Sequence, residues 1–145
     1  MSSYADTSFL VSLYGRDVNS QSAIAMVKKL RPHFMVTPFG ETEFTNVVFA
    51  VPVRPKGWSV SEASAIEENF VQDLKAGVWQ SEDLPPEVWA RARELARRHS
   101  PRLGCRVLDT LHVASALVLQ VQEFYTFDRD QATLARAAGL QVNGC

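Results

Sequence analysis

Short apolar segments typical of buried strands alternate along this chain with longer segments that show the periodicity of helices. Such alternation favours a mainly parallel sheet with helices covering both of its faces. A chain of 145 residues is long enough for one domain with a substantial core. We therefore predict a single α/β domain over residues 1–145. Its strands are predicted to end at Ala5 and to cover 34–37, 78–79, 123–126 and 140–142.

Helices are predicted between these strands, and several of them start at capping residues or stop near prolines. They are expected at 9–14, 23–30, 43–50 and 61–75, from Pro85 onward, from Asp109 onward, and from Asp128 or Asp130 onward. We expect Pro52 and Pro55 to close the third helix and Ser61 to cap the fourth. Trp89 is predicted to lie on the buried side of the fifth.

The composition is that of an ordinary globular protein, with 46% hydrophobic and 21% charged residues. The apolar runs are too short to cross a bilayer, and the N-terminus lacks the pattern of a signal peptide. Cys105 and Cys145 provide neither a disulfide framework nor the spacing of metal ligands, and Cys145 is expected to be exposed. We therefore predict a cytoplasmic protein without a membrane segment.

Positive charge is concentrated in one segment of a chain whose net charge is only −1. The segment RARELARRHSPRLGCR holds six arginines: Arg91, Arg93, Arg97, Arg98, Arg102 and Arg106. A nucleic-acid contact is one interpretation. The alternative is a solvated helix face that balances acidic segments elsewhere, and charge alone favours this alternative.

Acidic residues follow three of the predicted strands at the point where a helix begins. Asp6 follows the first strand, Glu43 the second and Asp128 the fourth, and Asp109 opens the apolar helix that leads into that fourth strand. In an open α/β sheet, ligand sites lie beyond the carboxyl ends of the strands. Four carboxylates from distant segments are therefore expected to converge at one edge.

Helix capping is the simpler explanation for each aspartate taken alone. Asp is a preferred N-cap residue and contributes about 1 kcal/mol there. This alternative applies to Asp109, and to Asp128 and Asp130, which compete for one cap. Glu43 is different because glutamate is a poorer cap and its apolar neighbours turn it inward. Glu41 is its rival, but helical geometry places Glu41 toward solvent.

Converging carboxylates repel one another, so a hard divalent cation is the expected counter-charge. Mg²⁺ prefers oxygen ligands and keeps several waters, and the sequence shows no His/Cys cluster for zinc and no glycine-rich phosphate loop. Thr7, Ser8 and Thr126 flank the acids and can cap helices, orient a carboxylate or touch a metal-bound water. His112 is interpreted as packing or hydrogen bonding within its own helix.

Four segments occur in an order that resembles one protein family. They are SYADTSFLVSLY, VTPFGETEF, LDTLHVASAL and FYTFDRDQATLARAAGLQV. Together they resemble the PIN-domain family and, within it, the VapC-like toxins of bacterial toxin–antitoxin pairs. The resemblance covers nearly the whole chain and is loosest between Ala50 and Gly77.

The resemblance implies a three-layer α/β/α sandwich with a mainly parallel central sheet and an acidic metal pocket. Asp6, Glu43, Asp109 and Asp128 match the family's four acids in order, and Thr126 matches the hydroxyl residue two positions before the last acid. The Thr37–Pro38 spacing favours Glu43 over Glu41. A helical arm at about 50–77 would correspond to the family's usual homodimer contact.

The resemblance also implies an activity and its partners. Such proteins are similar to metal-dependent endoribonucleases, which implies Mg²⁺ or Mn²⁺ held by Asp6 and Asp109, with Glu43 or Asp128 as a candidate further ligand. Arg102 and Arg106 would then guide the RNA backbone toward the acidic site. The implied protein partner is an antitoxin that lays a segment across the groove.

Two other functions remain open at the level of the sequence. One is a PIN-like regulatory domain that binds RNA or protein without turnover, although four acids held together are costly without a catalytic purpose. The other is a phospho-accepting receiver-like domain. That alternative calls for a lysine late in the chain near the pocket, and the last lysine is Lys75.

Overall fold

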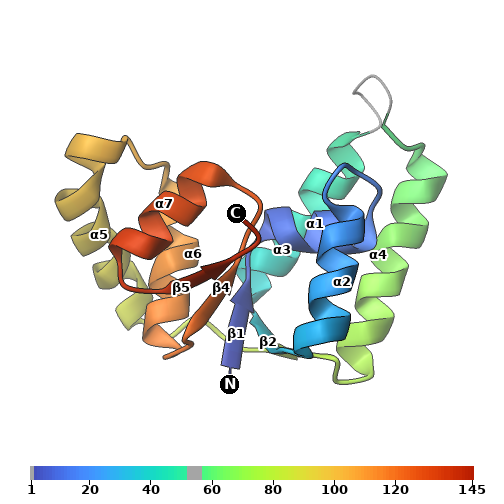
Figure 1. Cartoon of the computed structure of the whole chain (residues 1–145), viewed down its shortest axis with the longest axis horizontal. Coiled ribbons are helices and arrows are strands. Elements are labelled where there is room, and N and C mark those ends of the chain that lie inside the picture. Colours follow the sequence, from blue (N-terminus) through green and yellow to red (C-terminus); the bar gives the residue numbers. More distant parts are fainter. Residues whose placement is uncertain (1, 52–56) are drawn as a thin grey trace.

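A parallel sheet of five strands lies at the centre of the molecule (Figure 1). The computed structural model describes residues 2–51 and 57–145. The strands are β1 (Ser2–Ala5), β2 (His33–Val36), β3 (Trp79–Ser81), β4 (Glu123–Tyr125) and β5 (Gln141–Asn143). They are arranged in the order β3-β2-β1-β4-β5, and every neighbouring pair is parallel. Their carboxyl ends therefore share one edge of the sheet.

Helices cover both faces of this sheet. On one side lie α1 (Thr7–Tyr14), α2 (Ser20–Leu30), α3 (Pro38–Ala50) and α4 (Val60–Lys75), and on the other lie α5 (Glu87–Leu103), α6 (Val107–Val118) and α7 (Arg129–Ala137) (Figure 1). The predicted three-layer α/β/α sandwich with a parallel central sheet is confirmed. Over 2–51 and 57–145, no helix combines the length and apolarity needed to cross a membrane.

Successive side chains of β1 point to opposite faces of the sheet and belong to two separate hydrophobic cores. Ala5 packs into the core under α1–α4, and Tyr4 packs into the core under α5–α7. The first core is largely aromatic, with Phe34 stacked on Trp79 at a centroid distance of 4.6 Å. Burying one such side chain contributes about 1.5–3 kcal/mol. The central strand is therefore held from both faces, which fixes the position of Asp6 directly after it.

The starts of two helices differ from the prediction for reasons of capping. Helix α3 begins at Pro38 because the hydroxyl of Thr37 accepts a hydrogen bond from the backbone N–H of Gly40 at 3.1 Å, and proline suits the first helical position. Glu43 consequently lies in the second turn. Helix α4 is capped by Ser59 instead of Ser61, since Ser59 and Glu62 form a reciprocal capping box.

The buried face of α5 is turned by one residue from the predicted face. Trp89 is 55% exposed, whereas Val88 is fully buried beside Ala92 and Leu95. Val88, Ala92 and Leu95 form one apolar stripe at helical spacing, and Trp89 lies outside it, about 100° around the helix from Val88. The predicted roles of Pro52 and Pro55, and part of the predicted arm at 50–77, lie outside the described residues.

Candidate active site

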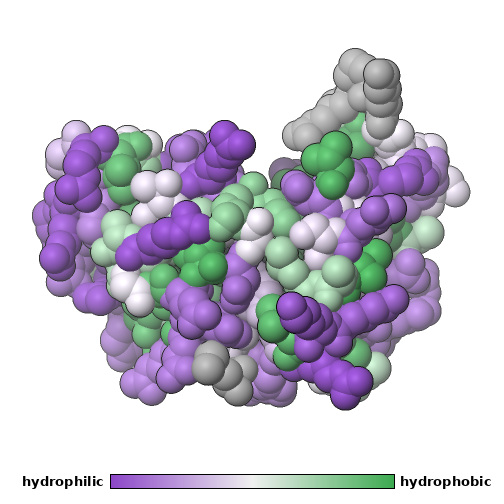
Figure 2. Space-filling view, viewed as in Figure 1, coloured by the Kyte–Doolittle hydropathy of each residue, from purple (hydrophilic) through white to green (hydrophobic). Residues whose placement is uncertain are grey.

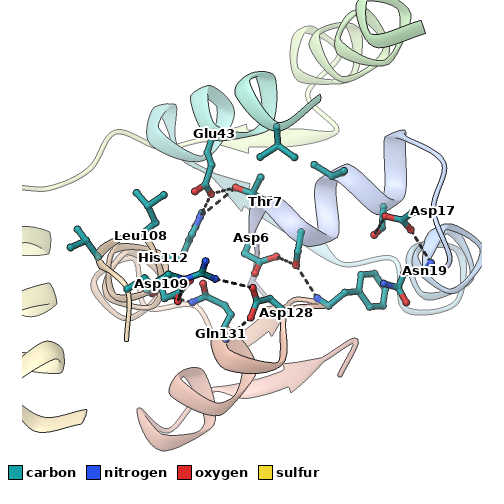
Figure 3. A pocket seen from close by; sticks show the side chains of 17 residues that line it. Asp6, Thr7, Asp17, Asn19, Glu43, Leu108, Asp109, His112, Asp128 and Gln131 are labelled. Carbon is teal, nitrogen blue, oxygen red and sulfur yellow. Dashed lines mark hydrogen bonds and ion pairs between the residues drawn. The ribbon is translucent and has the colours of Figure 1, made fainter. Parts of the chain in front are cut away.

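One cavity collects the four predicted acids at the carboxyl edge of the sheet. Asp6 caps α1 after β1, and Asp128 caps α7 after β4. Glu43 reaches the same place from α3, and Asp109 from the first turn of α6. The cavity has a volume of about 490 Å³, and all four carboxylates line it. Figure 3 shows Asp6, Asp109 and Asp128 grouped together, with Glu43 facing them beside Thr7 and His112.

Asp6 is the most completely held of these acids. Its Oδ1 accepts hydrogen bonds from the Ser8 hydroxyl at 2.7 Å and from the backbone N–H of Phe9 at 3.0 Å. Its Oδ2 accepts one from the Thr126 hydroxyl at 2.5 Å. Thr126 and Ser8 also lie 3.2 Å apart, so both hydroxyl residues join the β1 and β4 ends of the pocket. The structure thus brings two of the three predicted flanking hydroxyls, those of Ser8 and Thr126, onto one carboxylate.

Asp109 and Asp128 face each other across one arginine side chain. Arg106 lies 3.4 Å from Asp109 Oδ2 through Nε and 3.6 Å from Asp128 Oδ2 through a terminal nitrogen. Asp128 also accepts the backbone N–H of Gln131 at 3.0 Å as the N-cap of α7. Asp109 occupies the third position of α6, and Arg106 takes the cap position, so Asp109 is not the N-cap of this helix. Arg106 is thus an ion-pair partner of two pocket acids.

Glu43 is bound by hydrogen-bond donors from two other elements. Nε2 of His112 on α6 lies 2.7 Å from Glu43 Oε1, and the Thr7 hydroxyl donates to the same oxygen. His112 Nδ1 lies 2.8 Å from the Tyr4 hydroxyl in the core. His112 is buried and packs against Phe39. Its hydrogen bonds are not made within its own helix, because its partners come from β1 and α3.

The electrostatics separate Glu43 from the two aspartates. Burial raises the pKa of Asp6. Burial also raises the pKa of Asp109, with Arg106 opposing the shift and the charge of Asp128 adding to it. Burial alone would raise the pKa of Glu43, but the hydrogen bond and charge of His112, together with Thr7 and Arg106, lower that pKa overall. Negative charge is therefore costly around Asp109 and stabilised at Glu43.

The donor set fits a hydrated Mg²⁺ or Mn²⁺ ion. Within the two described ranges, no three His, Cys, Asp or Glu side chains stand close enough to ligate one ion directly. Mg²⁺ does not require such a cage, because it keeps several waters and is usually bound by one or two carboxylates. The pKa values of Asp6 and Asp109 are raised by burial, and that of Asp109 also by the charge of Asp128, so a divalent cation would stabilise the charged form of both carboxylates.

The two remaining predicted contacts lie in different places. Arg106 lines the cavity, whereas Arg102 is exposed in the last turn of α5 and does not line it. Glu41, the rival of Glu43, accepts a hydrogen bond from Ser81 at 2.8 Å on the surface. The structure therefore places Glu43, and not Glu41, in the cavity.

Two buried polar residues of the pocket were missed as site residues. His112 follows Asp109 by three positions on α6, a spacing that puts both on one helix face and could have identified it. Gln131 is 2% exposed, and its amide donates to the backbone carbonyl of Asp109 at 3.0 Å. It follows the cap residue Asp128 by three positions, where a glutamine usually bonds back to the cap, so the sequence pointed to a different partner.

Solved structures with the same fold support the architecture. The VapC20 toxin of Mycobacterium tuberculosis, described as cleaving the sarcin-ricin loop, superposes with a TM-score of 0.69 at 22% identity, covering 95% of each chain. VapBC2 of Rickettsia felis, bound to a DNA fragment from its promoter, gives 0.66 at 13% identity over 99% of this chain and 98% of the other. FitAcB of Neisseria gonorrhoeae gives 0.64 at 12% identity, with coverage of 97% and 95%.

These likenesses confirm the resemblance to VapC-like proteins at the level of the fold. Among curated proteins, none matches the sequence. The model of the PIN domain, however, matches residues 3–138 and thus spans all four pocket acids. The chain belongs to the PIN-domain family.

Proposed function

We propose that this protein is a metal-dependent endoribonuclease that cleaves RNA phosphodiester bonds as the toxin of a toxin–antitoxin pair. The observation that carries the proposal is the convergence of Asp6, Glu43, Asp109 and Asp128 on one cavity from four distant segments. PIN-family membership and the sarcin-ricin loop cleavage named for VapC20 support it.

The four acids would have different roles in binding one or two ions. Asp6 and Asp109 would hold Mg²⁺ or Mn²⁺, because both are buried carboxylates whose raised pKa a cation would lower again. Glu43 and Asp128 would orient waters around the ion. Thr7 would keep Glu43 in place, and Ser8 and Thr126 would keep Asp6 in place. The ion would supply activation of a water and stabilisation of charge at the phosphate.

Arginine side chains would compensate for the negative charge that repels RNA. Arg106 is 72% exposed while it contacts Asp109 and Asp128, so it can exchange a carboxylate for a phosphate oxygen. Arg102, in the last turn of α5, would contact the RNA backbone farther along. Arg106 would thus bind the RNA next to the scissile bond.

An antitoxin and a second copy of the chain are the proposed protein partners. VapBC2 and FitAcB are named as two-component assemblies, which supports an antitoxin. Val107 and Leu108 line the cavity and are 72% and 47% exposed, so an apolar segment of a partner could cover them. The homodimer contact is proposed for the arm near 50–77, and a cytoplasmic location follows the earlier prediction.

The direct test is RNA cleavage by the purified chain, freed of any partner. Structured cellular RNA is incubated with Mg²⁺ or Mn²⁺, with excess EDTA, and with metal and Asp109→Asn. We expect discrete fragments in the first condition alone. Asp6→Asn should behave like Asp109→Asn, and Glu41→Gln on the surface serves as the matched control that keeps activity.

The competing function is a PIN-like domain that binds RNA or protein without cleaving it. It predicts that RNA is retained but stays intact with metal present, and that Asp109→Asn changes neither result. Cleavage that persists in EDTA, or in both aspartate variants, would instead remove the metal pocket from the reaction.

A further inference from the structure

The buried ring of His112 connects the hydrophobic core to one acid of the pocket. His112 is 2% exposed and Tyr4 is fully buried. Nδ1 contacts the Tyr4 hydroxyl at 2.8 Å and Nε2 contacts Glu43 Oε1 at 2.7 Å, so both ring nitrogens are engaged. The ring of Phe39 lies against the imidazole with centroids 4.6 Å apart. The ring is therefore fixed in position and in rotation.

The chemistry of the Glu43 carboxylate decides that Nε2 carries a proton. A carboxylate can only accept a hydrogen bond, so Nε2 must be the donor in its contact with Glu43. On the other side of the ring, the Tyr4 hydroxyl can either donate to Nδ1 or accept from it. Both contacts are therefore satisfied as long as Nε2 carries a proton.

We propose that Tyr4 and His112 form a positioning network that holds Glu43 in the orientation needed for the metal site. The proposal deepens the proposed function and rests on it, because it assigns a supporting role within the same site. Fixing a glutamate side chain costs rotamer entropy, so an unsupported Glu43 would sample several orientations.

The network also fixes the spacing between two acids on different helices. His112 follows Asp109 on α6, while Glu43 belongs to α3 on the other side of the sheet. The imidazole therefore binds the Glu43 carboxylate to the same helix that carries Asp109. Tyr4, whose ring stacks on Phe124 with centroids 5.4 Å apart, anchors this helix to the central strands. A shift of α6 would move Asp109 and the support of Glu43 together.

The first test compares substitutions by the affinity for Mn²⁺, measured by calorimetry without RNA. Loss of a residue that supports a metal ligand typically weakens metal affinity or activity about 10- to 100-fold. We expect a loss in this range for His112→Leu, and a smaller one for His112→Gln, whose amide can still donate to Glu43. His99→Leu removes another buried histidine, on α5 and outside the cavity, and should leave the affinity unchanged.

A double-mutant cycle separates positioning from a merely structural role. In a Glu43→Ala background, His112→Leu should cause no further loss of Mn²⁺ affinity, because the carboxylate that it positions is gone. An equal loss in both backgrounds would overturn the proposal, as would an unchanged affinity in His112→Leu. Thermal unfolding of each variant is measured alongside, so that a folding defect is recognised.

A metal-free measurement tests the network independently of the nuclease function. Nitrogen-15 NMR of the ring shows which nitrogens are protonated, and we expect His112 to carry a proton on Nε2. Tyr4→Phe removes the hydroxyl that contacts Nδ1 and should shift the Nδ1 resonance and reduce Mn²⁺ affinity. An Nε2 without a proton in the parent would overturn the network. If the parent binds Mn²⁺ but cleaves no RNA, the proposed reaction fails while the network is still tested.

Discussion

Asp109 is a buried carboxylate near the start of its helix that is not the N-cap of that helix. It lies three residues into α6, 8% exposed, with Arg106 and Asp128 as its charged neighbours. The sequence showed the acid among apolar residues, but not whether it capped the helix or faced a shared site. That distinction depended on where α6 begins, and in the structure it begins at Val107, two residues before Asp109.

The raised pKa of Asp109 predicts how stability changes with pH in the absence of metal. A carboxyl whose folded pKa lies above its unfolded pKa stabilises the fold at low pH, and this contribution is lost as the pH rises through the folded value. Asp109→Asn should reduce that loss and raise the melting temperature at pH 7 in EDTA. Thermal unfolding of both proteins from pH 3 to 8 measures how steeply stability falls as the pH rises. A variant that loses stability as steeply as the parent would contradict the prediction.

Thr126 should be the hydroxyl on which the pocket depends most. It donates to Asp6 Oδ2 and accepts the backbone N–H of Asp128 at 3.0 Å. Thr126→Val keeps the shape but removes both contacts, and hydrogen bonds to charged groups contribute about 1.5–3 kcal/mol. We expect a loss of this size in the free energy of unfolding by denaturant. Thr126→Ser, which keeps the hydroxyl, should lose much less; equal losses would show that the methyl group matters instead.

At the scale of elements, the ends of helices were harder to predict than their existence. The helical spacing of apolar residues indicated α3 and α4. Helix α3 nevertheless starts five residues before Glu43, because Thr37 as the cap and Pro38 at the first position favour a helix start there. Helix α4 starts at Val60 because Ser59 has Glu62 three residues later. Both signals were present in the sequence, but several candidate caps competed within each segment.

The capping box of α4 gives a prediction with a control on the same helix. Ser59→Ala removes the cap and should lower the free energy of unfolding by about 1 kcal/mol. Ser61→Ala changes an exposed position inside the helix and should have little effect. Denaturant unfolding of both variants tests whether Ser59 or Ser61 is the cap. A larger loss of stability for Ser61→Ala would contradict the assignment of Ser59.

At the scale of the whole molecule, the sandwich follows from its alternating elements, but the strand order does not. Parallel pairing was predictable because helices separate the strands. The central place of β1, between β2 and β4, depends on contacts between residues up to 120 positions apart, such as Thr126 with Asp6. The convergence of four acids was predictable too, because the carboxyl ends of parallel strands share one edge of the sheet. The donors to Glu43 were not, because they come from separate elements.

The proposed homodimer is also a property of the whole molecule. Val60 starts α4 in the arm and is 61% exposed, and an acidic residue is tolerated at a helix N-terminus. Val60→Glu should therefore convert a dimer to a monomer without unfolding the chain. Val18→Glu, at a position that is 97% exposed outside the arm, should leave the dimer intact. Light scattering should give about twice the 16.2 kDa chain mass for the parent; a monomeric parent would exclude the contact.

The most direct test of the metal pocket is anomalous diffraction from crystals grown with Mn²⁺. If the four acids share a divalent ion, an anomalous peak should lie in the cavity within ligand distance of Asp6 or Asp109, and Arg106 should have moved away from Asp109. The same crystals of Asp109→Asn should lose the peak. A peak only at surface carboxylates, or none at a Mn²⁺ concentration that supports RNA cleavage, would contradict the account of this site.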